Sequence, residues 1–189
     1  DCFMVPSKSF LSALLAVNLT WMLDGCDSIG RFDQALGKLF EKDISSGKLD
    51  LQFARDLLDE LWGNFERMNA WNLQIGGWTP EGKDGCNELT RECINACGRN
   101  KFRRPNVALR ITSETPDKFI VDALKAISKG SGRPALYNDD LYVKTLKSMD
   151  LGLNDEDSRE IGFGGCTETM IAGLSNVGSL EGSLNLAKA

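Results

Sequence analysis

Hydrophobic residues recur at helical spacing through the first 70 residues of the chain. Residues 9–22 are apolar on nearly every side, which is typical of a buried helix. A second helix is predicted where apolar side chains return every three to four positions between Phe32 and Phe40. A third apolar stripe comprises Phe53, Leu57, Leu58, Leu61, Trp62 and Phe65. We therefore expect residues 1–70 to be mostly helical, with each helix burying one face.

The pattern changes to alternating strands and helices after residue 71. Short apolar runs at 72–78, 107–112 and 134–137 predict strands. Helices are predicted over 86–97, from Thr115 as N-cap with Pro116 in the first turn to the stop at Gly130, and over 139–149. Strands that alternate with helices favour parallel pairing. Residues 71–189 are thus expected to be an α/β sheet or barrel within a single domain.

Composition and charge exclude several classes of protein. The 189 residues suffice for about one domain, and 42% are hydrophobic. The net charge of −5 disfavours nucleic-acid binding, which usually needs a basic surface. The longest apolar stretch, residues 10–23, is interrupted by Asn18 and Thr20 and is shorter than the roughly 20 residues that span a bilayer. We expect no membrane segment, no targeting signal and a cytoplasmic location.

The absence of histidine restricts the available chemistry. Serine and cysteine catalysis with a histidine base is excluded within this chain, as are zinc sites of the HExxH type. Six cysteines are present without any C-x-x-C pair. Cys93 and Cys97 would share one helix face, and we expect free, partly buried thiols rather than a metal or redox pair. Chemistry must therefore rest on carboxylates, cysteines, hydroxyls or a radical.

The most informative segment is Gly-Phe-Gly-Gly-Cys-Thr-Glu at residues 162–168. In extended backbone, Cys166 and Glu168 would point to the same side with their Cα atoms about 7 Å apart. A carboxylate opposes ionisation of a nearby thiol, so the pair disfavours an ionic nucleophile. It suits a neutral S–H that donates a hydrogen atom beside an acid/base carboxyl. The spacing alone also fits a buried structural cysteine.

Several segments, in a shared order, resemble the glycyl radical enzyme family, the pyruvate formate-lyase-like enzymes. They are Ser28-Ile29-Gly30-Arg31-Phe32-Asp33-Gln34, Ile75-Gly76-Gly77, Asp84-Gly85-Cys86-Asn87-Glu88-Leu89-Thr90, Pro105-Asn106-Val107-Ala108-Leu109-Arg110, Gly132-Arg133-Pro134-Ala135-Leu136-Tyr137-Asn138-Asp139 and Gly165-Cys166-Thr167-Glu168. The resemblance implies part of a large α/β barrel whose loops meet at its centre. It implies that Cys166 carries a thiyl radical and that Glu168 is the carboxylate of the "C-x-E" subgroup.

The same resemblance implies the reaction and the partners. The expected chemistry is elimination (dehydration or C–N or C–S cleavage) or decarboxylation of a small organic substrate. Gly165 stands where the formate-lyase branch has a second cysteine, so pyruvate–formate chemistry is disfavoured. No cofactor or metal is expected to bind this chain directly. The glycyl radical would lie outside it, installed by an S-adenosylmethionine-dependent activating enzyme, and the complete protein would be a homodimer.

The chain is expected to be an internal fragment. It contains no arginine-glycine-tyrosine segment of the kind that bears the glycyl radical. We expect it to be inactive alone, and to be completed by the remainder of the same polypeptide or by another chain. Two alternatives stay open. One is a non-catalytic remnant or binding scaffold of the same fold, and the other is a Cys-Glu hydrolase similar to nitrilase-type amidases.

Overall fold

The computed structural model describes residues 6–24, 28–164, 168–171 and 174–175. The helices are α1 (Phe10–Asp24), α2 (Phe32–Ser45), α3 (Leu51–Arg67), α4 (Glu88–Arg99), α5 (Asp117–Ala126), which continues into the π-helical turn η1 (Ile127–Ser131), and α6 (Asp139–Ser148). The strands are β1 (Ser28–Arg31), β2 (Asn72–Gly76), β3 (Asn106–Ile111), β4 (Ala135–Asn138), β5 (Ile161–Gly164) and β6 (Glu168–Ile171). Across these residues, no helix has the length and apolar character needed to cross a bilayer.

Four strands form a parallel sheet in the order β1-β2-β3-β4. Parallel neighbours need crossover connections, and each of the three connections between these strands contains at least one helix. The predicted α/β class is confirmed. Sequential order of parallel strands is also the order found in the wall of a barrel, so the sheet is compatible with that expectation.

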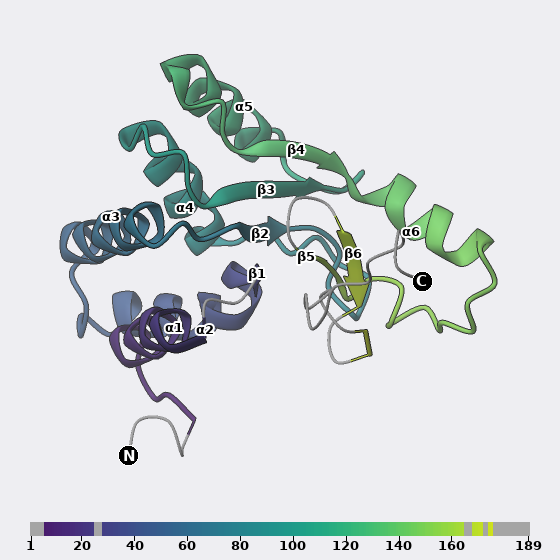
Figure 1. Cartoon of the computed structure of the whole chain (residues 1–189), viewed down its shortest axis with the longest axis horizontal. Helices are drawn as coiled ribbons and strands as arrows, with labels where there is room; N and C mark the ends of the chain where they lie inside the picture. The colour runs from purple at the N-terminus through teal and green to yellow at the C-terminus, as the bar shows by residue number, and fades with distance from the viewer. Residues whose placement is uncertain (1–5, 25–27, 165–167, 172–173, 176–189) are drawn as a thin grey trace, which may run out of the picture.

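The two faces of the sheet have different partners. Leu73, Ile75, Val107 and Leu109 lie in the main hydrophobic core with residues of α1 to α5. Alternate positions face the other way, as the strand period of two requires. Ala108 packs on that side with residues of β5 and α6. In Figure 1, α1 to α5 gather on the left, while α6 and the antiparallel pair β5–β6 lie on the right.

Three of the differences from the sequence prediction have a clear physical cause. Strand β1 is unexpected, because four residues are too few to show alternation and its order comes from pairing with β2. Helix α4 begins at Glu88 rather than 86, where Asn87 and Thr90 form a capping box. Helix α5 begins at Asp117 with Pro116 as N-cap. The Thr115 side chain is not the cap, since its hydroxyl donates to the Asp84 carboxylate at 2.5 Å.

Candidate active site

Strands β5 and β6 form a hairpin that flanks the predicted catalytic cysteine in sequence. Gly164 pairs with Glu168 at one end, and Ile161 pairs with Ile171 at the other. Cys166 lies outside the described residues, so its proximity to Glu168 stays a prediction. The Glu168 side chain is exposed at the paired end of the hairpin. The structure therefore places one of the two predicted site residues.

The two faces of the hairpin differ in bulk. Ile161 and Phe163 are fully buried, and the Phe163 ring lies 4.7 Å from that of Tyr137, centroid to centroid. Directly paired residues point to the same side of an antiparallel sheet. The opposite face therefore carries Glu168 beside Gly164, which has no side chain.

A buried ion pair lies beneath this hairpin. Arg110 of β3 and Asp139 at the start of α6 are 0% and 1% exposed, and two hydrogen bonds of 2.7 and 2.9 Å join them. Asp139 also accepts from the Trp78 backbone N–H at 2.8 Å. A side chain at Gly77 would come within 2.7 Å of Arg110 Nε, and its φ of +82° favours glycine. The Gly76-Gly77 motif therefore lets the chain pass close to the ion pair.

Arg110 also holds the segment that leads into the hairpin. Its Nη1 donates to the Ile161 carbonyl at 2.5 Å, and its Nη2 donates to the Arg159 carbonyl at 3.1 Å. A buried guanidinium needs most of its N–H groups satisfied, and here two backbone carbonyls and one carboxylate do so. The ion pair and the entry to β5 are thus one connected network.

Two further side chains reach the same segment from β1 and β2. Arg31 Nη1 donates to Glu160 Oε2 at 3.0 Å, and its Nη2 donates to the Trp78 carbonyl at 2.6 Å. Burial and the nearby Arg110 lower the pKa of Arg31, while Glu160 opposes that shift. The fully buried Gln74 donates to the Phe163 carbonyl at 2.9 Å. We call Arg31, Gln74 and Arg110 the sheet clamp.

A second buried carboxyl joins the motif segments on the helix side. Asp33 accepts from the Gly76 N–H at 2.8 Å and from the Thr90 hydroxyl at 2.5 Å. Burial raises the pKa of Asp33, and these hydrogen bonds oppose the shift. Gln34 donates to the Gly85 carbonyl at 2.7 Å. Three of the segments that carry the family resemblance, 28–34, 75–77 and 84–90, thus meet at the carboxyl end of the sheet.

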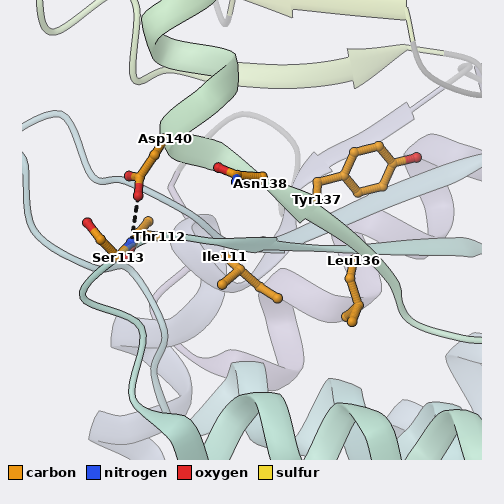
Figure 2. Close-up of a pocket in the computed structure, with 7 residues that line it drawn as sticks. All are labelled: Ile111, Thr112, Ser113, Leu136, Tyr137, Asn138 and Asp140. Carbon is orange, nitrogen blue, oxygen red and sulfur yellow. Dashed lines mark hydrogen bonds between the residues drawn. The ribbon is translucent and has the colours of Figure 1, made fainter.

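Two hollows lie near these elements. One, of about 430 Å³, lies where β3 and β4 end, and in Figure 2 the Ser113 N–H points at Asp140, to which it donates at 2.9 Å. Leu136 and Tyr137 extend to opposite sides of β4 there. The other, of about 450 Å³ and mostly apolar, lies between α6 and β6 and includes Thr169. The second hollow therefore adjoins the strand that begins with Glu168.

The described cysteines do not form a metal site. Within the described part of the chain, no cluster of three or more potential metal-ligating side chains occurs. Cys86, Cys93 and Cys97 are free thiols, and Cys93 and Cys97 are buried on α4. Burial raises the pKa of Cys97 to about 12. Such thiols stay protonated and unreactive near neutral pH.

Comparison with protein families gives a match over residues 22–189 to the family described as pyruvate formate lyase-like. The chain belongs to this family. Its members are glycyl radical enzymes, and the α/β fold of the chain agrees with their structures. The family resemblance read from the motifs is thereby confirmed.

Individual relatives agree with this assignment. Trans-4-hydroxy-L-proline dehydratase of Clostridioides difficile is 33% identical over 84% of this chain and 22% of its own length. Isethionate sulfite-lyase of Oleidesulfovibrio alaskensis is 29% identical over 97% of this chain and 25% of its own length. A glycyl radical enzyme structure from Archaeoglobus fulgidus superposes with a TM-score of 0.76 and 28% identity, covering 88% of this chain and 24% of that one. The chain spans about a quarter of the length of these proteins.

The sequence alone predicts no role for the sheet clamp. Arg31 and Arg110 lie within the segments that carry the family resemblance, and Gln74 lies in none of them. A signal was present, since Gln74 and Arg110 are polar residues inside otherwise apolar strands. A buried polar side chain in such a strand must be hydrogen-bonded, so its partners are worth seeking.

Proposed function

We propose that this chain is the part of a glycyl radical enzyme that supplies the thiyl cysteine, Cys166, and the acid/base carboxyl, Glu168. The reaction is radical elimination (dehydration or C–N or C–S cleavage) or decarboxylation of a small organic substrate. The observation that carries this proposal is the position of Glu168. It is exposed and paired with Gly164 at the end of the β5–β6 hairpin, two residues from the cysteine, in a family whose relatives include a dehydratase and a sulfite-lyase.

The proposed elimination balances without any further oxidant or reductant. The Cys166 sulfur radical takes a hydrogen atom from a substrate C–H bond, giving a thiol and a carbon radical. The Glu168 carboxyl takes a proton from the substrate or gives one to the leaving group, which departs with the electron pair of the broken bond. The product radical then takes the hydrogen atom back from Cys166. The thiyl radical is regenerated for the next cycle.

The glycyl radical would come from outside this chain. At the start of turnover it would take the hydrogen atom of the Cys166 thiol, which would leave the radical on sulfur and restore the glycine C–H bond. We propose that an S-adenosylmethionine-dependent activating enzyme installs it, and that the remaining three quarters of the polypeptide, or a completing chain, carries it. The complete protein would act as a homodimer.

The test uses the longest natural polypeptide that carries these residues, activated without oxygen and assayed against hydroxylated, sulfonated and arylacetate substrates. Cys166→Ser should abolish turnover while the glycyl radical still forms, as read by EPR. Glu168→Gln should retain hydrogen exchange into the substrate but slow product formation by roughly 10²-fold. Cys86→Ser is the control and should keep its activity. Full turnover by Cys166→Ser would exclude the thiyl role, and no turnover by the parent would favour a non-catalytic scaffold.

A further inference from the structure

We propose that the sheet clamp of Arg31, Gln74 and Arg110 positions the cysteine hairpin, by fixing how far β5 extends along the sheet. These are positioning residues, since Gln74 and Arg110 act through the backbone of β5 and Arg31 acts through the Glu160 side chain just before it. The inference rests on the proposed function only for the purpose of the positioning, which is the placement of the catalytic cysteine. The contacts from which it is argued all lie among the residues that the structure describes.

Two members of the clamp, Gln74 and Arg110, contact the edge of β5 that faces away from β6. An edge strand has backbone groups with no partner strand. In β5, the carbonyls of Ile161 and Phe163 accept instead from Arg110 and Gln74. Ile161 and Phe163 are separated by one position, so the two bonds fix the distance of β5 from the sheet and its register along the sheet. A hydrophobic contact alone would allow β5 to shift along its own axis.

The donors come from three neighbouring strands. Arg31 lies opposite Gln74 in the β1–β2 pairing, and Arg110 lies opposite Gly76 in the β2–β3 pairing. Their side chains therefore form a row across the face of the sheet that contacts the hairpin. Each member of the row has a further hydrogen-bond partner. Arg110 donates to Asp139 at 2.7 Å, Gln74 to Asn72 at 2.8 Å and Arg31 to the Trp78 carbonyl at 2.6 Å. These bonds restrict the side-chain conformations of the row.

Gln74 has one polar atom that reaches the hairpin and one that is unpaired. Its Nε2 lies within hydrogen-bond distance of the Phe163 carbonyl at 2.9 Å, Asn72 Oδ1 at 2.8 Å and Ser28 Oγ at 3.1 Å. Its Oε1 is buried and has no hydrogen-bond partner among the described residues, which is destabilising. Of the three acceptors of Nε2, only Phe163 belongs to the hairpin, so this is the bond that would restrain it.

Placement matters because hydrogen-atom transfer requires the reacting atoms to meet closely. A misplacement of about 1 Å can lower an enzymatic rate by roughly 10²-fold. Gly162 and Gly164 have no side chains, so β5 itself contributes no side-chain packing on that face. Hydrogen bonds from the clamp would supply the missing restraint.

Hydrogen–deuterium exchange tests the inference without any need for the radical. The protein is again the longest natural polypeptide that carries these residues, not activated. Gln74→Leu removes the donor at similar volume, and Arg110→Lys keeps the charge for Asp139 but loses the fork that reaches both carbonyls. Peptides covering residues 159–171 should exchange at least ~10-fold faster in both variants, while β2 and β3 peptides change by less than about twofold.

Arg55→Met is the matched control. It removes an ion pair with Glu92 at 2.8 Å on the helix side of the sheet, and it should leave exchange of the hairpin unchanged. Hairpin exchange that stays within about twofold of the parent in Gln74→Leu would overturn the inference. Equal acceleration in β2 and β3 would also overturn it, because the residue would then stabilise the whole sheet. If Arg110→Lys fails to fold, Gln74→Leu still decides.

Activity supplies an independent readout. In the activated enzyme, Gln74→Leu should lower kcat by roughly 10²-fold with KM and glycyl radical content unchanged. A loss of radical content in proportion to activity would indicate a general folding defect and contradict a positioning role. If the parent has no turnover, the proposed function fails while the exchange result still decides whether the clamp holds the hairpin.

Discussion

Gly162 shows how closely the hairpin approaches the sheet. A Cβ atom at this position would lie 3.2 Å from Met170 Cγ and 3.3 Å from Gln74 Oε1. We predict that Gly162→Ala displaces one of these side chains and lowers the free energy of unfolding by about 1–3 kcal/mol. Urea unfolding of the 189-residue chain measures this change.

A matched glycine provides the control for that substitution. Gly63 lies inside α3, where a new Cβ would meet nothing nearer than 3.5 Å. Gly63→Ala should leave stability unchanged or raise it by up to about 1 kcal/mol, because alanine favours helix. An equally stable Gly162→Ala variant would show that the hairpin has more room than these distances allow.

The Arg110–Asp139 pair supports a prediction about a buried charge. Asp139→Asn would leave the fully buried Arg110 guanidinium without its carboxylate, and we expect a loss of about 3–5 kcal/mol in stability. Asp122→Asn is the comparison, since its contact with the largely exposed Lys125 is 3.8 Å long and should contribute less than about 1 kcal/mol. Thermal unfolding of both variants gives the two values, and similar losses would argue against a special role for the buried pair.

At the scale of the elements, the two buried cysteines of α4 can report how often this helix becomes exposed to solvent. Burial raises the pKa of Cys97 to about 12, so roughly one thiol in ten thousand is ionised at pH 8. We predict that Cys93 and Cys97 react with iodoacetamide only as fast as the helix layer opens. Mass spectrometry of labelled peptides should show rates that rise steeply with urea. Fast labelling without denaturant would place these thiols at an accessible surface instead.

The helices were more predictable than the strands, for a physical reason. Stripes such as Leu58, Leu61 and Phe65 repeat over several turns, so the periodicity of α3 is evident in sequence. Strand β1 has four residues and exists only because β2 pairs with it. Strand β5 likewise has hydrogen-bond partners in Gln74 and Arg110, which lie some 50 to 90 residues away in the chain. Long-range partners of this kind leave little trace in a local pattern.

The candidate site likewise has a part that the sequence predicts and a part that it does not. Cys166 and Glu168 could be proposed because their spacing and the motif around them lie within a few consecutive residues. The clamp could not be proposed, because its residues come together only when strands from three parts of the chain lie side by side. Arg110 is an example. A single arginine in an apolar strand can be buried because it pairs with Asp139, which lies 29 residues later in the chain.

At the scale of the whole molecule, the chain presents apolar surface that an isolated domain would normally cover. Leu15 and Leu23 on α1 are 60% and 77% exposed, and Leu136 on the edge strand β4 is 42% exposed. Exposed apolar patches and open strand edges promote association. We therefore predict that the 189-residue chain, studied by itself, associates as its concentration rises.

Light scattering coupled to size-exclusion chromatography measures this association. Leu15→Lys combined with Leu23→Lys should shift the chain towards monomer, because charge replaces the apolar face of α1. Gln52→Lys combined with Ser148→Lys adds the same charge at exposed polar positions and serves as the control. If both pairs reduce association equally, net charge rather than the α1 surface drives it. If neither does, the β4 edge becomes the surface to test, with Leu136→Lys as the next variant.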